Sequence, residues 1–582
     1  MIQLVKNARL AVGVISQHLV DDPFLLYLQA SRRLPAVVRP LGRVVTAVFP
    51  KGSVAVPVLL ASMSNGDDAD VKRRLELALC GDAKGEQARR LADIALSAGL
   101  TEISDTLLAR AGNAPGLKAV RARRLWHDGN LSGAVTALDG SGAAGRRQQA
   151  RLAGEAAVYA GAAPSLQRQE FTPVPGRVLH LLTNSLPHTA SGYAQRSHSI
   201  MVAQREAGWD VLAVTRLGYP VQVGKFLAQA SDVVDGVRYR RLLPARLAQT
   251  MDARLQQQAE ELLQVALEFR PSVLHTTTHF VNGLVVRAVA QALGIPWVYE
   301  VRGQLADTWA ATRGPEALDS EKYKLFQARE TEVMQDADLV VTLGQAMKAN
   351  IVAAGIPGEK IIIAPNAVGG AFLQQPRDAA AARRELGLPE DGLYIGTVSS
   401  LVAYEGLDDL VRSFALLAPD FPQLRLLIVG DGVAGPALRK QVQGLGLADR
   451  AIFTGRVPRD QTPLYHQALD VFVVPRKDLD VTRAVTPLKP IEALASARPV
   501  VGSDLPALRE IIDDGGNGLL VPAASPDRLA HTISALLLDA SRRASMGHAG
   551  RAAVLAERTW AANAKALAAR YAGLHHEHEE ID

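Results

Sequence analysis

The chain has 582 residues, which is too long for one hydrophobic core, so we expect about three domains. Its composition, 48% hydrophobic and 21% charged, is typical of a globular protein, and the net charge of +5 gives no argument for nucleic acid as a partner. The single cysteine, Cys80, excludes a disulfide framework and a cysteine-rich metal site, and it fits a reducing cytosol.

The first 22 residues lack the long apolar core and the small-residue cleavage site of a signal peptide, and Arg, Lys and Pro interrupt the later apolar runs. We therefore expect a cytoplasmic protein that at most rests on the inner face of the cell membrane. The basic and apolar segment 31–53 has two interpretations: peripheral contact with anionic lipid, or a solvated helix or loop.

Residues 1–170 are rich in Ala, Leu and Arg and predict an all-helical region. From about Ala83 the helices come in pairs at a spacing of about thirty residues, and WHDGNLSGAVTAL (126–138) looks like the turn of a tetratricopeptide-type repeat. Such an array would offer a surface to a protein partner, whereas a packed helical cap is the alternative.

A linker with several prolines, near residues 162–176, leads to a different periodicity. Apolar strands alternate with helices, which predicts a doubly wound α/β domain with a parallel sheet over residues 177–370. A second domain of the same kind is expected over residues 392–555. We expect the last helix, within residues 556–582, to cross back to the first α/β domain.

Two such domains that face each other leave a cleft at the carboxyl ends of their strands, where open α/β sheets bind ligands. Polar residues gather in the loops at those ends. They are Ser191, Gly192, Tyr193, His275, His279, Glu300 and Arg302 in the first domain, and Ser399, Ser400, Tyr404, Glu405, Gly430, Arg456, Arg476, Lys489 and Glu492 in the second. Each alone has a structural explanation, such as a core histidine at position 275, but together they predict a binding site.

The stretch TPLKPIEALASARPVV (486–501) predicts a turn, a short helix and a strand, because proline is tolerated only at or before the first helical turn. Free backbone N–H groups at the helix start, with Lys489 beside them, suit a phosphate. Glu492, one turn further on, can accept hydrogen bonds from hydroxyls such as those of a ribose. The alternative is an ordinary crossover with a solvated lysine and glutamate.

Four blocks follow one another in the second α/β domain: IGTVSSLVAYEGLDDLV, LLIVGDGVAGPALRKQV, IFTGRVPRDQTPLYHQALDVFVVPR and TPLKPIEALASARPVVGSDLPALREIIDDGGNGLLVP. The first domain adds SGYAQRSH, VLHTTTHF, YEVRG and APNAV. Through these runs, residues 177–575 resemble the retaining glycosyltransferases of family 4, which have the GT-B fold. The resemblance implies two Rossmann-like domains, with the acceptor on the first and a nucleotide-sugar donor on the second. Residues 1–170 lie outside it.

The resemblance assigns donor residues one by one. In the family's Glu-x7-Glu motif the second Glu holds the ribose and matches Glu492, whereas the first matches Ala484. The chain instead resembles a subgroup with a Pro-x-Lys-x-x-Glu form, here Pro487 to Glu492. Arg456 and Val457 match the loop whose backbone reads the base.

The diphosphate site departs from the family. Ser399 or Ser400, and Glu405, occupy the block in which the family has its diphosphate-binding Arg and Lys. We infer that Lys489, Arg476 and the backbone at Leu488 supply the missing partners, with Gly430 in the neighbouring turn. A histidine that contacts a sugar in the family matches His275 or His279, and which of the two serves stays open.

The implied reaction moves a sugar from a UDP or GDP sugar to an acceptor hydroxyl with retention of configuration, and it requires no metal or other cofactor. The acceptor would be a sugar, a lipid-linked or a small molecule in polysaccharide, glycolipid or glycoconjugate synthesis. A non-catalytic relative that acts as a scaffold through its helical region is the alternative, favoured by Ala484 and Glu405. A nicotinamide-dependent oxidoreductase ranks last, because no clean GxGxxG follows the first strand of either domain.

Overall fold

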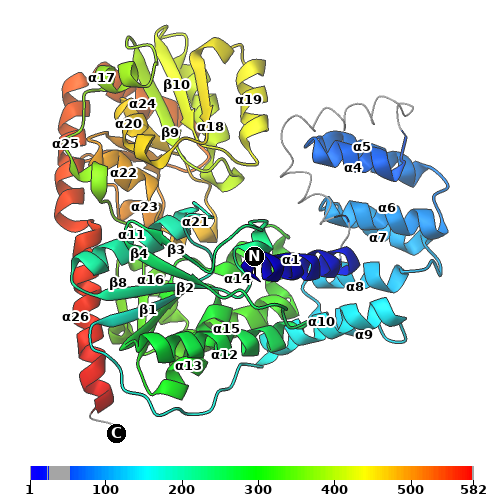
Figure 1. Cartoon of the computed structure of the whole chain (residues 1–582). Coiled ribbons are helices and arrows are strands. Elements are labelled where there is room, and N and C mark those ends of the chain that lie inside the picture. Colours follow the sequence, from blue (N-terminus) through cyan, green and yellow to red (C-terminus); the bar gives the residue numbers. More distant parts are fainter. Residues whose placement is uncertain (1, 22–23, 25–52, 580–582) are drawn as a thin grey trace.

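The computed structural model describes residues 2–21, 24 and 53–579 (Figure 1). Residues 31–52, for which membrane contact was considered above, therefore lie outside the described residues. No helix in the described ranges combines the length and the apolar character needed to cross a bilayer.

The expected helical region is confirmed in the residues that the structure describes. Its helices are α1 (Ile2–Asp21), α4 (Val56–Ser64), α5 (Asp68–Cys80), α6 (Gly85–Ser97), α7 (Thr101–Arg110), α8 (Leu117–His127), α9 (Leu131–Thr136) and α10 (Ala143–Ala160). Polar side chains cap the starts of α5 and α9: the Asn130 side chain, for example, accepts a hydrogen bond from the N–H of Gly133 at 2.8 Å. Helices α4 to α9 extend to one side of the two α/β domains (Figure 1). The tetratricopeptide-type repeat stays a prediction.

The first α/β domain contains an eight-stranded sheet of order β3-β4-β2-β1-β5-β6-β7-β8, in which β3 alone is antiparallel to its neighbour. The strands are β1 (Arg177–Leu182), β2 (Asp210–Thr215), β3 (Ser231–Val234), β4 (Val237–Arg241), β5 (Val273–Thr277), β6 (Trp297–Val301), β7 (Leu339–Thr342) and β8 (Ile361–Ile363). Its main helices are α11 (Gly192–Glu206), α12 (Met251–Phe269), α13 (Phe280–Leu293), α14 (Leu305–Ala310), α15 (Glu321–Asp336) and α16 (Gln345–Ala353).

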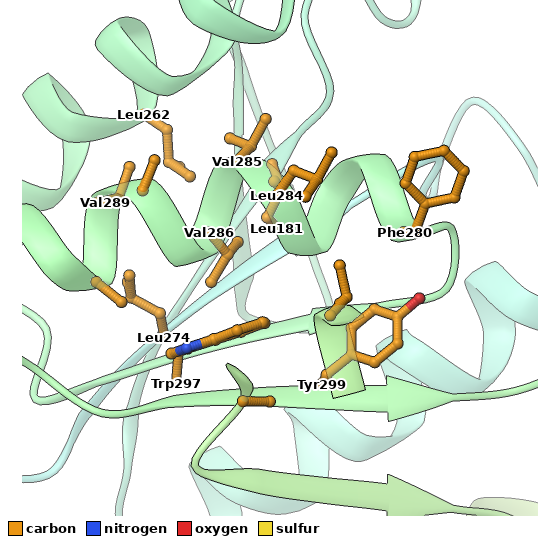
Figure 2. Close-up of a cluster of buried hydrophobic side chains, with 14 of the residues drawn as sticks. Leu181, Leu262, Leu274, Phe280, Leu284, Val285, Val286, Val289, Trp297 and Tyr299 are labelled. Carbon is orange, nitrogen blue, oxygen red and sulfur yellow. The ribbon is translucent and has the colours of Figure 1, made fainter. Parts of the chain in front are cut away.

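The core of this domain shows why its central strands, β1, β2 and β5 to β7, are buried on both faces. Helix α13 lays Leu284 and Val286 onto β5 and β6, where Leu274 and Trp297 face them (Figure 2). All four side chains are buried. A parallel sheet is covered by helices on both faces, so its strands lack the polar alternation of a half-exposed sheet.

The second α/β domain has an all-parallel six-stranded sheet of order β11-β10-β9-β12-β13-β14. The strands are β9 (Leu393–Val398), β10 (Leu424–Val429), β11 (Ala451–Gly455), β12 (Val471–Val474), β13 (Val500–Ser503) and β14 (Gly518–Val521). The helices named below are α18 (Leu407–Leu417), α20 (Thr462–Gln467), α21 (Asp480–Ala484), α22 (Lys489–Ala495), α25 (Ala540–Glu557) and α26 (Trp560–Glu579). The expected fold class, two parallel-sheet α/β domains after a helical region, is confirmed.

Two segments connect the α/β domains, and they run side by side. Helix α25 lies on the second domain and α26 packs on α11 of the first, so that together they form the red column along both domains (Figure 1). At their junction, the N–H of Val368 donates to the carbonyl of Arg558 at 2.9 Å, and the N–H of Trp560 donates back to Val368 at 3.1 Å. The other connection, which follows β8, is thereby tied to the start of α26.

Candidate functional site

The turn at residues 486–489 begins helix α22 of the second α/β domain, with proline in the first helical turn as the sequence predicts. Lys489 Nζ lies 2.9 Å from Glu492 Oε2, because side chains three residues apart share one side of a helix. The Lys489 side chain is 36% exposed and that of Glu492 is 12% exposed. The structure therefore brings these two predicted residues together at the start of α22.

Glu492 is held as a carboxylate. Burial by itself would raise the pKa of Glu492, but Lys489 and His466 outweigh it and lower the pKa to about 2. His466, on α20, is fully buried with its Nε2 atom 3.4 Å from Glu492 Oε2. An ionised carboxylate only accepts hydrogen bonds, so the free lone pairs of Glu492 suit hydroxyl donors. Sequence reasoning missed His466, and its place in the LYHQALD run carries no signal of this contact.

Ala484 stands where the resembled family has its first motif glutamate, and the structure gives a physical reason. The Ala484 side chain is 2% exposed and belongs to the main apolar cluster of the first α/β domain. A carboxylate at this position would be buried among apolar groups, at a cost of several kcal/mol. The 486–489 turn therefore follows a segment that is packed against the other domain.

Arg476 and Glu405 form a buried pair. The guanidinium donates to both Glu405 oxygens, at 2.8 and 3.2 Å, and to the carbonyl of Val485 at 2.9 Å. Glu405 does not cap α18, because Gly406 takes the N-cap position, and its carboxylate pairs with Arg476 instead. Because Glu405 balances its charge, Arg476 adds no net positive charge for a diphosphate.

A cation that sequence reasoning missed, Arg459, lies near Glu492. Arg459 follows β11, three residues after the predicted Arg456, and its guanidinium donates to Ser199 Oγ of the first domain at 3.2 Å. Burial lowers the pKa of Arg459, while the nearby carboxylate of Glu492 acts in the opposite direction. The signal was the second arginine of the RVPRD run, which lies in the loop that was already singled out.

The other predicted second-domain residues lie in loops that follow its strands. Ser399 and Ser400 follow β9, Gly430 follows β10, and Arg456 and Val457 follow β11, with Arg456 exposed. Gly430 has φ +132°, and a Cβ there would lie 1.9 Å from the Ser399 carbonyl oxygen, so only glycine lets these two loops approach so closely.

In the first domain, Ser191 caps α11 by accepting a hydrogen bond from the N–H of Ala194 at 3.3 Å, and Gly192 is the first residue of that helix. Tyr193 is 46% exposed and lies near Tyr404 of the second domain, itself 40% exposed. These two rings are therefore the exposed aromatic groups that the domains bring toward each other at the predicted cleft.

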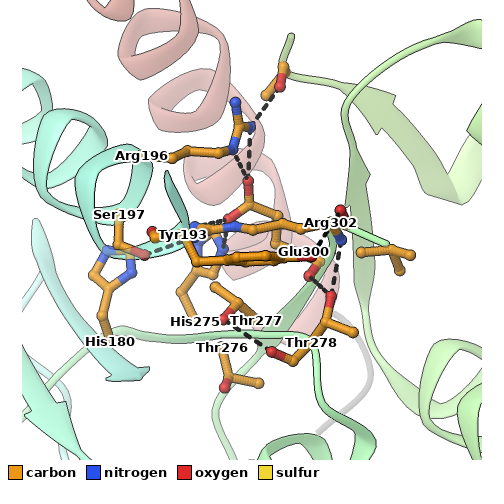
Figure 3. Close-up of polar contacts among 12 residues, drawn as sticks. His180, Tyr193, Arg196, Ser197, His275, Thr276, Thr277, Thr278, Glu300 and Arg302 are labelled. Carbon is orange, nitrogen blue, oxygen red and sulfur yellow. Dashed lines mark hydrogen bonds and ion pairs between the residues drawn. The ribbon is translucent and has the colours of Figure 1, made fainter. Parts of the chain in front are cut away.

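Glu300 and Arg302 are buried in a polar network (Figure 3). Glu300 is paired with Arg302 and with Arg196 of α11, the latter at 2.7 Å. Burial would raise the pKa of Glu300, but the two arginines hold it well below its ordinary value. Arg302 in turn donates to the Tyr193 carbonyl at 3.0 Å and to Ser197 Oγ at 2.7 Å. Both residues thus hold the first turns of α11.

The two predicted histidines are enclosed. His275 is 1% exposed, with Nδ1 2.5 Å from the Tyr571 hydroxyl and its ring stacked on His180 at 4.7 Å. His279 caps α13 and stacks on Phe326 at 5.0 Å. The alternative of a core histidine describes His275, and a role for either residue at a sugar stays a prediction. In the part of the chain that the structure describes, no three His, Cys, Asp or Glu side chains gather as metal ligands would.

Comparisons with known families assign both α/β domains. Residues 191–367 match the family "Glycosyl transferase 4-like domain", and residues 378–553 match "Glycosyl transferases group 1".

Two curated relatives illustrate the sequence similarity. The chain is 33% identical over 199 residues to the GDP-mannose-dependent alpha-(1-6)-phosphatidylinositol monomannoside mannosyltransferase of Mycobacterium tuberculosis, a match that covers 34% of this chain and 51% of the relative. It is 30% identical over 294 residues to the D-inositol 3-phosphate glycosyltransferase of Acidothermus cellulolyticus, covering 48% and 63%. The chain therefore spans about half to two thirds of the length of these relatives.

Solved structures show the same fold. Sucrose-phosphate synthase from Thermosynechococcus elongatus matches with a TM-score of 0.57 and 21% identity, over 69% of this chain and 100% of that one. Anabaena HepE in complex with UDP matches with a TM-score of 0.54 and 18% identity, over 68% and 100%. These likenesses confirm the GT-B fold. The chain therefore contains a glycosyl transferase 4-like domain followed by a group 1 glycosyl transferase domain.

Proposed function

We propose that this protein is a retaining glycosyltransferase that moves a sugar from a UDP or GDP sugar to an acceptor hydroxyl. The observation that carries the proposal is the pair of Lys489 and ionised Glu492 at the start of α22, within the group 1 domain. This pair is the Pro-x-Lys-x-x-Glu form of the donor motif, and we place the chain in the subgroup that has it. The relatives named above are glycosyltransferases by name, which supports the same activity.

Each donor group has a partner in this proposal. Glu492 accepts hydrogen bonds from the ribose hydroxyls, and the backbone of Arg456 and Val457 reads the base. Lys489 binds the diphosphate beside the backbone of Pro487 and Leu488, in the cleft end that also holds Ser399, Ser400 and Gly430. Arg459 takes the place that the sequence assigned to Arg476, because Glu405 neutralises Arg476 whereas Arg459 reaches toward Glu492.

The chemistry follows from these charges. The leaving diphosphate gains negative charge as the glycosidic bond breaks, so fixed cations stabilise the transition state more than the ground state. Lys489 and Arg459 supply two positive charges against the single carboxylate of Glu492, and the proposal invokes no metal or other cofactor. A glycosidase would need two carboxyl groups at a set separation, whereas Glu405 is engaged with Arg476 and position 484 is alanine.

The acceptor would lie against the first domain, near Ser191, Gly192 and the exposed ring of Tyr193. Arg302, itself paired with Glu300, donates to the backbone carbonyl of Tyr193 and so holds this part of the chain in place. Its class is a sugar, a lipid-linked or a small molecule in polysaccharide, glycolipid or glycoconjugate synthesis. Residues 1–170 would offer a surface to a protein partner, since α4 to α7 extend away from the α/β domains (Figure 1).

A place at the inner face of the membrane is part of the proposal, and α1 supports it. Leu4, Val5, Val12 and Ile15 are 42% to 66% exposed, and helical spacing places them on one stripe. Exposed Lys6 and Arg9 lie beside this stripe, as in helices that rest on anionic lipid. The protein should therefore sediment together with vesicles that contain anionic lipid. The double variant Val12→Ser and Ile15→Ser should reduce the fraction of protein that sediments with them.

The decisive experiment is a panel of UDP and GDP sugars tested for thermal stabilisation and for donor hydrolysis. One nucleotide should stabilise the wild type, and Glu492→Gln should weaken its binding by about 1–3 kcal/mol, the range for a lost hydrogen bond to a charged group. Asp504→Asn, which removes an exposed carboxylate of the same domain, is the control and should bind normally.

If Glu492→Gln binds UDP and GDP as tightly as the wild type does, Glu492 is not part of the donor site. Binding without turnover against any acceptor class would favour the scaffold alternative. The two departures that favoured that alternative, Ala484 and Glu405, have structural reasons in the domain contact and in the pair with Arg476.

A further inference from the structure

Asn366 lies in the APNAV run, residues 364–368, on the connection that leaves the first α/β domain after β8. It is 7% exposed, and both ends of its side-chain amide are engaged. Its Oδ1 accepts a hydrogen bond from Arg196 Nη1 of α11 at 3.2 Å. Its Nδ2 donates to the backbone carbonyl of Thr486 in the second domain at 2.8 Å. One buried side chain thus joins α11 to the turn that carries Lys489.

Chemistry fixes the orientation of this amide. A guanidinium has only donors and a carbonyl has only acceptors, so the oxygen must face Arg196 and the NH₂ group must face Thr486. Arg196 is held on its other sides by Glu300 at 2.7 Å and by the carbonyls of Ala364 and Pro365 at 2.6 and 3.0 Å. Asn366 is therefore presented to Thr486 from a rigid base.

The residues on either side of Thr486 also pack against the first domain. Val485 packs against the cluster that contains Ala484, and Leu488 packs against the cluster that contains Tyr571. The Thr486 hydroxyl faces the Leu343 carbonyl at 3.5 Å, at the outer limit of a hydrogen bond. Apolar contacts alone do not fix the rotation of the turn, whereas hydrogen bonds are directional. Arg476 of the second domain donates to the Val485 carbonyl at 2.9 Å, and Asn366 donates to the next carbonyl, that of Thr486, at 2.8 Å. The orientation of the helix start is thus set in part from the other domain.

We propose that Asn366 is a positioning residue for the donor site: it fixes the Thr486 carbonyl and so aims Lys489 and Glu492 at the nucleotide diphosphate. This inference rests on the proposed function and deepens it. It also makes the connection between the domains part of the donor site, because the Asn366 amide is hydrogen-bonded to Arg196, which is paired with Glu300.

Asn366→Asp is the sharpest variant. Aspartate has the size of asparagine and still accepts from Arg196, but it presents an oxygen to the Thr486 carbonyl, and the two oxygens repel. We expect the 486–489 turn to move, with at least a tenfold loss of affinity for the nucleotide and a rise of KM for the donor sugar but not for the acceptor. Asn366→Ala removes the bond without repulsion and serves if the aspartate variant does not fold. It should also lower the affinity for the nucleotide and raise KM for the donor sugar.

Asn563→Asp is the matched control. Asn563, on α26, is 4% exposed and donates through Nδ2 to the carbonyl of Pro365 at 2.7 Å, so its described hydrogen bond ends on the residue before Asn366. The substitution makes the same chemical change on the same connection without touching Thr486. We expect a comparable loss of thermal stability and an unchanged nucleotide affinity.

Hydrogen exchange read by mass spectrometry tests the turn without any ligand. Backbone amides of residues 486–492 should exchange faster in Asn366→Asp than in wild type, and at the wild-type rate in Asn563→Asp. Equal exchange and equal affinity in the two variants would show that Asn366 only stabilises the connection, which overturns the proposal. A wild type that binds neither UDP nor GDP would instead refute the proposed function, and the exchange comparison would still decide whether Asn366 orients the turn.

Discussion

The hydroxyl of Tyr571 on α26 lies 2.5 Å from Nδ1 of His275 at the centre of the first α/β domain. Gln204 Nε2 donates to the same hydroxyl at 3.1 Å. Nε2 of His275 faces the Glu300 carboxylate at 3.6 Å, so neutral His275 carries its proton on Nε2, and its Nδ1 accepts a hydrogen bond from the Tyr571 hydroxyl. The last helix is therefore tied by a directed chain of hydrogen bonds from Gln204 through Tyr571 to His275, which lies against Glu300 of the network that holds the start of α11.

Tyr571→Phe should destabilise the first domain by about 1–3 kcal/mol, because it leaves the amide of Gln204 and Nδ1 of His275 buried without this partner. Urea unfolding followed by Trp fluorescence measures the change. Tyr394→Phe in the second domain is the control, since the Tyr394 hydroxyl donates to the single carbonyl of Pro389. A larger loss in the control than in Tyr571→Phe would contradict the directed chain.

Stability should depend on pH through His279. Burial and the charge of Lys322 lower the pKa of His279 to about 4, below the ordinary value near 6.5. The unfolded state then binds more protons between these values, so the contribution is complete above about pH 6.5 and is lost as the pH falls toward 4. The expected loss over that window is about 3 kcal/mol.

His279→Gln removes this titration, so its free energy of unfolding should change less between pH 7 and pH 5 than that of wild type. Comparing the two proteins cancels the contributions of other titrating groups. Parallel pH profiles would show that His279 is not held neutral by the fold.

Lys489→Met should reduce turnover with a nucleotide sugar far more than it lowers stability, because the side chain is 36% exposed and the proposal gives it the diphosphate charge. Glu405→Gln should instead lower stability more than turnover. It leaves the buried guanidinium of Arg476 without its counter-charge, at a cost on the order of 3 kcal/mol. The two variants are compared at matched thermal stability. If the lysine variant turns over normally and the glutamate variant does not, the diphosphate binds at the loop after β9 and not at Lys489.

Ala484→Glu restores the usual family motif and should nonetheless lower both stability and donor binding. The new carboxylate would be buried in the apolar cluster of the first domain, at a cost on the order of 3 kcal/mol or more. Thermal melting and nucleotide titration measure the two effects. Ala484→Gln has the same size without the charge and separates the two causes, and a gain of activity in Ala484→Glu would refute the packing explanation.

The sequence by itself determined the features that depend on near neighbours in the chain. Alternating apolar strands and helices were sufficient to predict two doubly wound domains, because both faces of a parallel sheet are covered and the pattern is local. The pairing of Lys489 with Glu492 was predictable for a similar reason, since a helical turn places residues three apart on one side.

Only the tertiary structure decided which charges are free and which residues face the other domain. Glu405 meets Arg476 across 71 residues of chain, Arg459 meets Ser199 across 260, and His275 meets Tyr571 across 296. Residue type and spacing carry no information about such pairs, because the packing of one sheet, helix or domain against another sets their distances. The sequence therefore located the helix start that carries the candidate site, and the contact between the domains determined the environment of its charges.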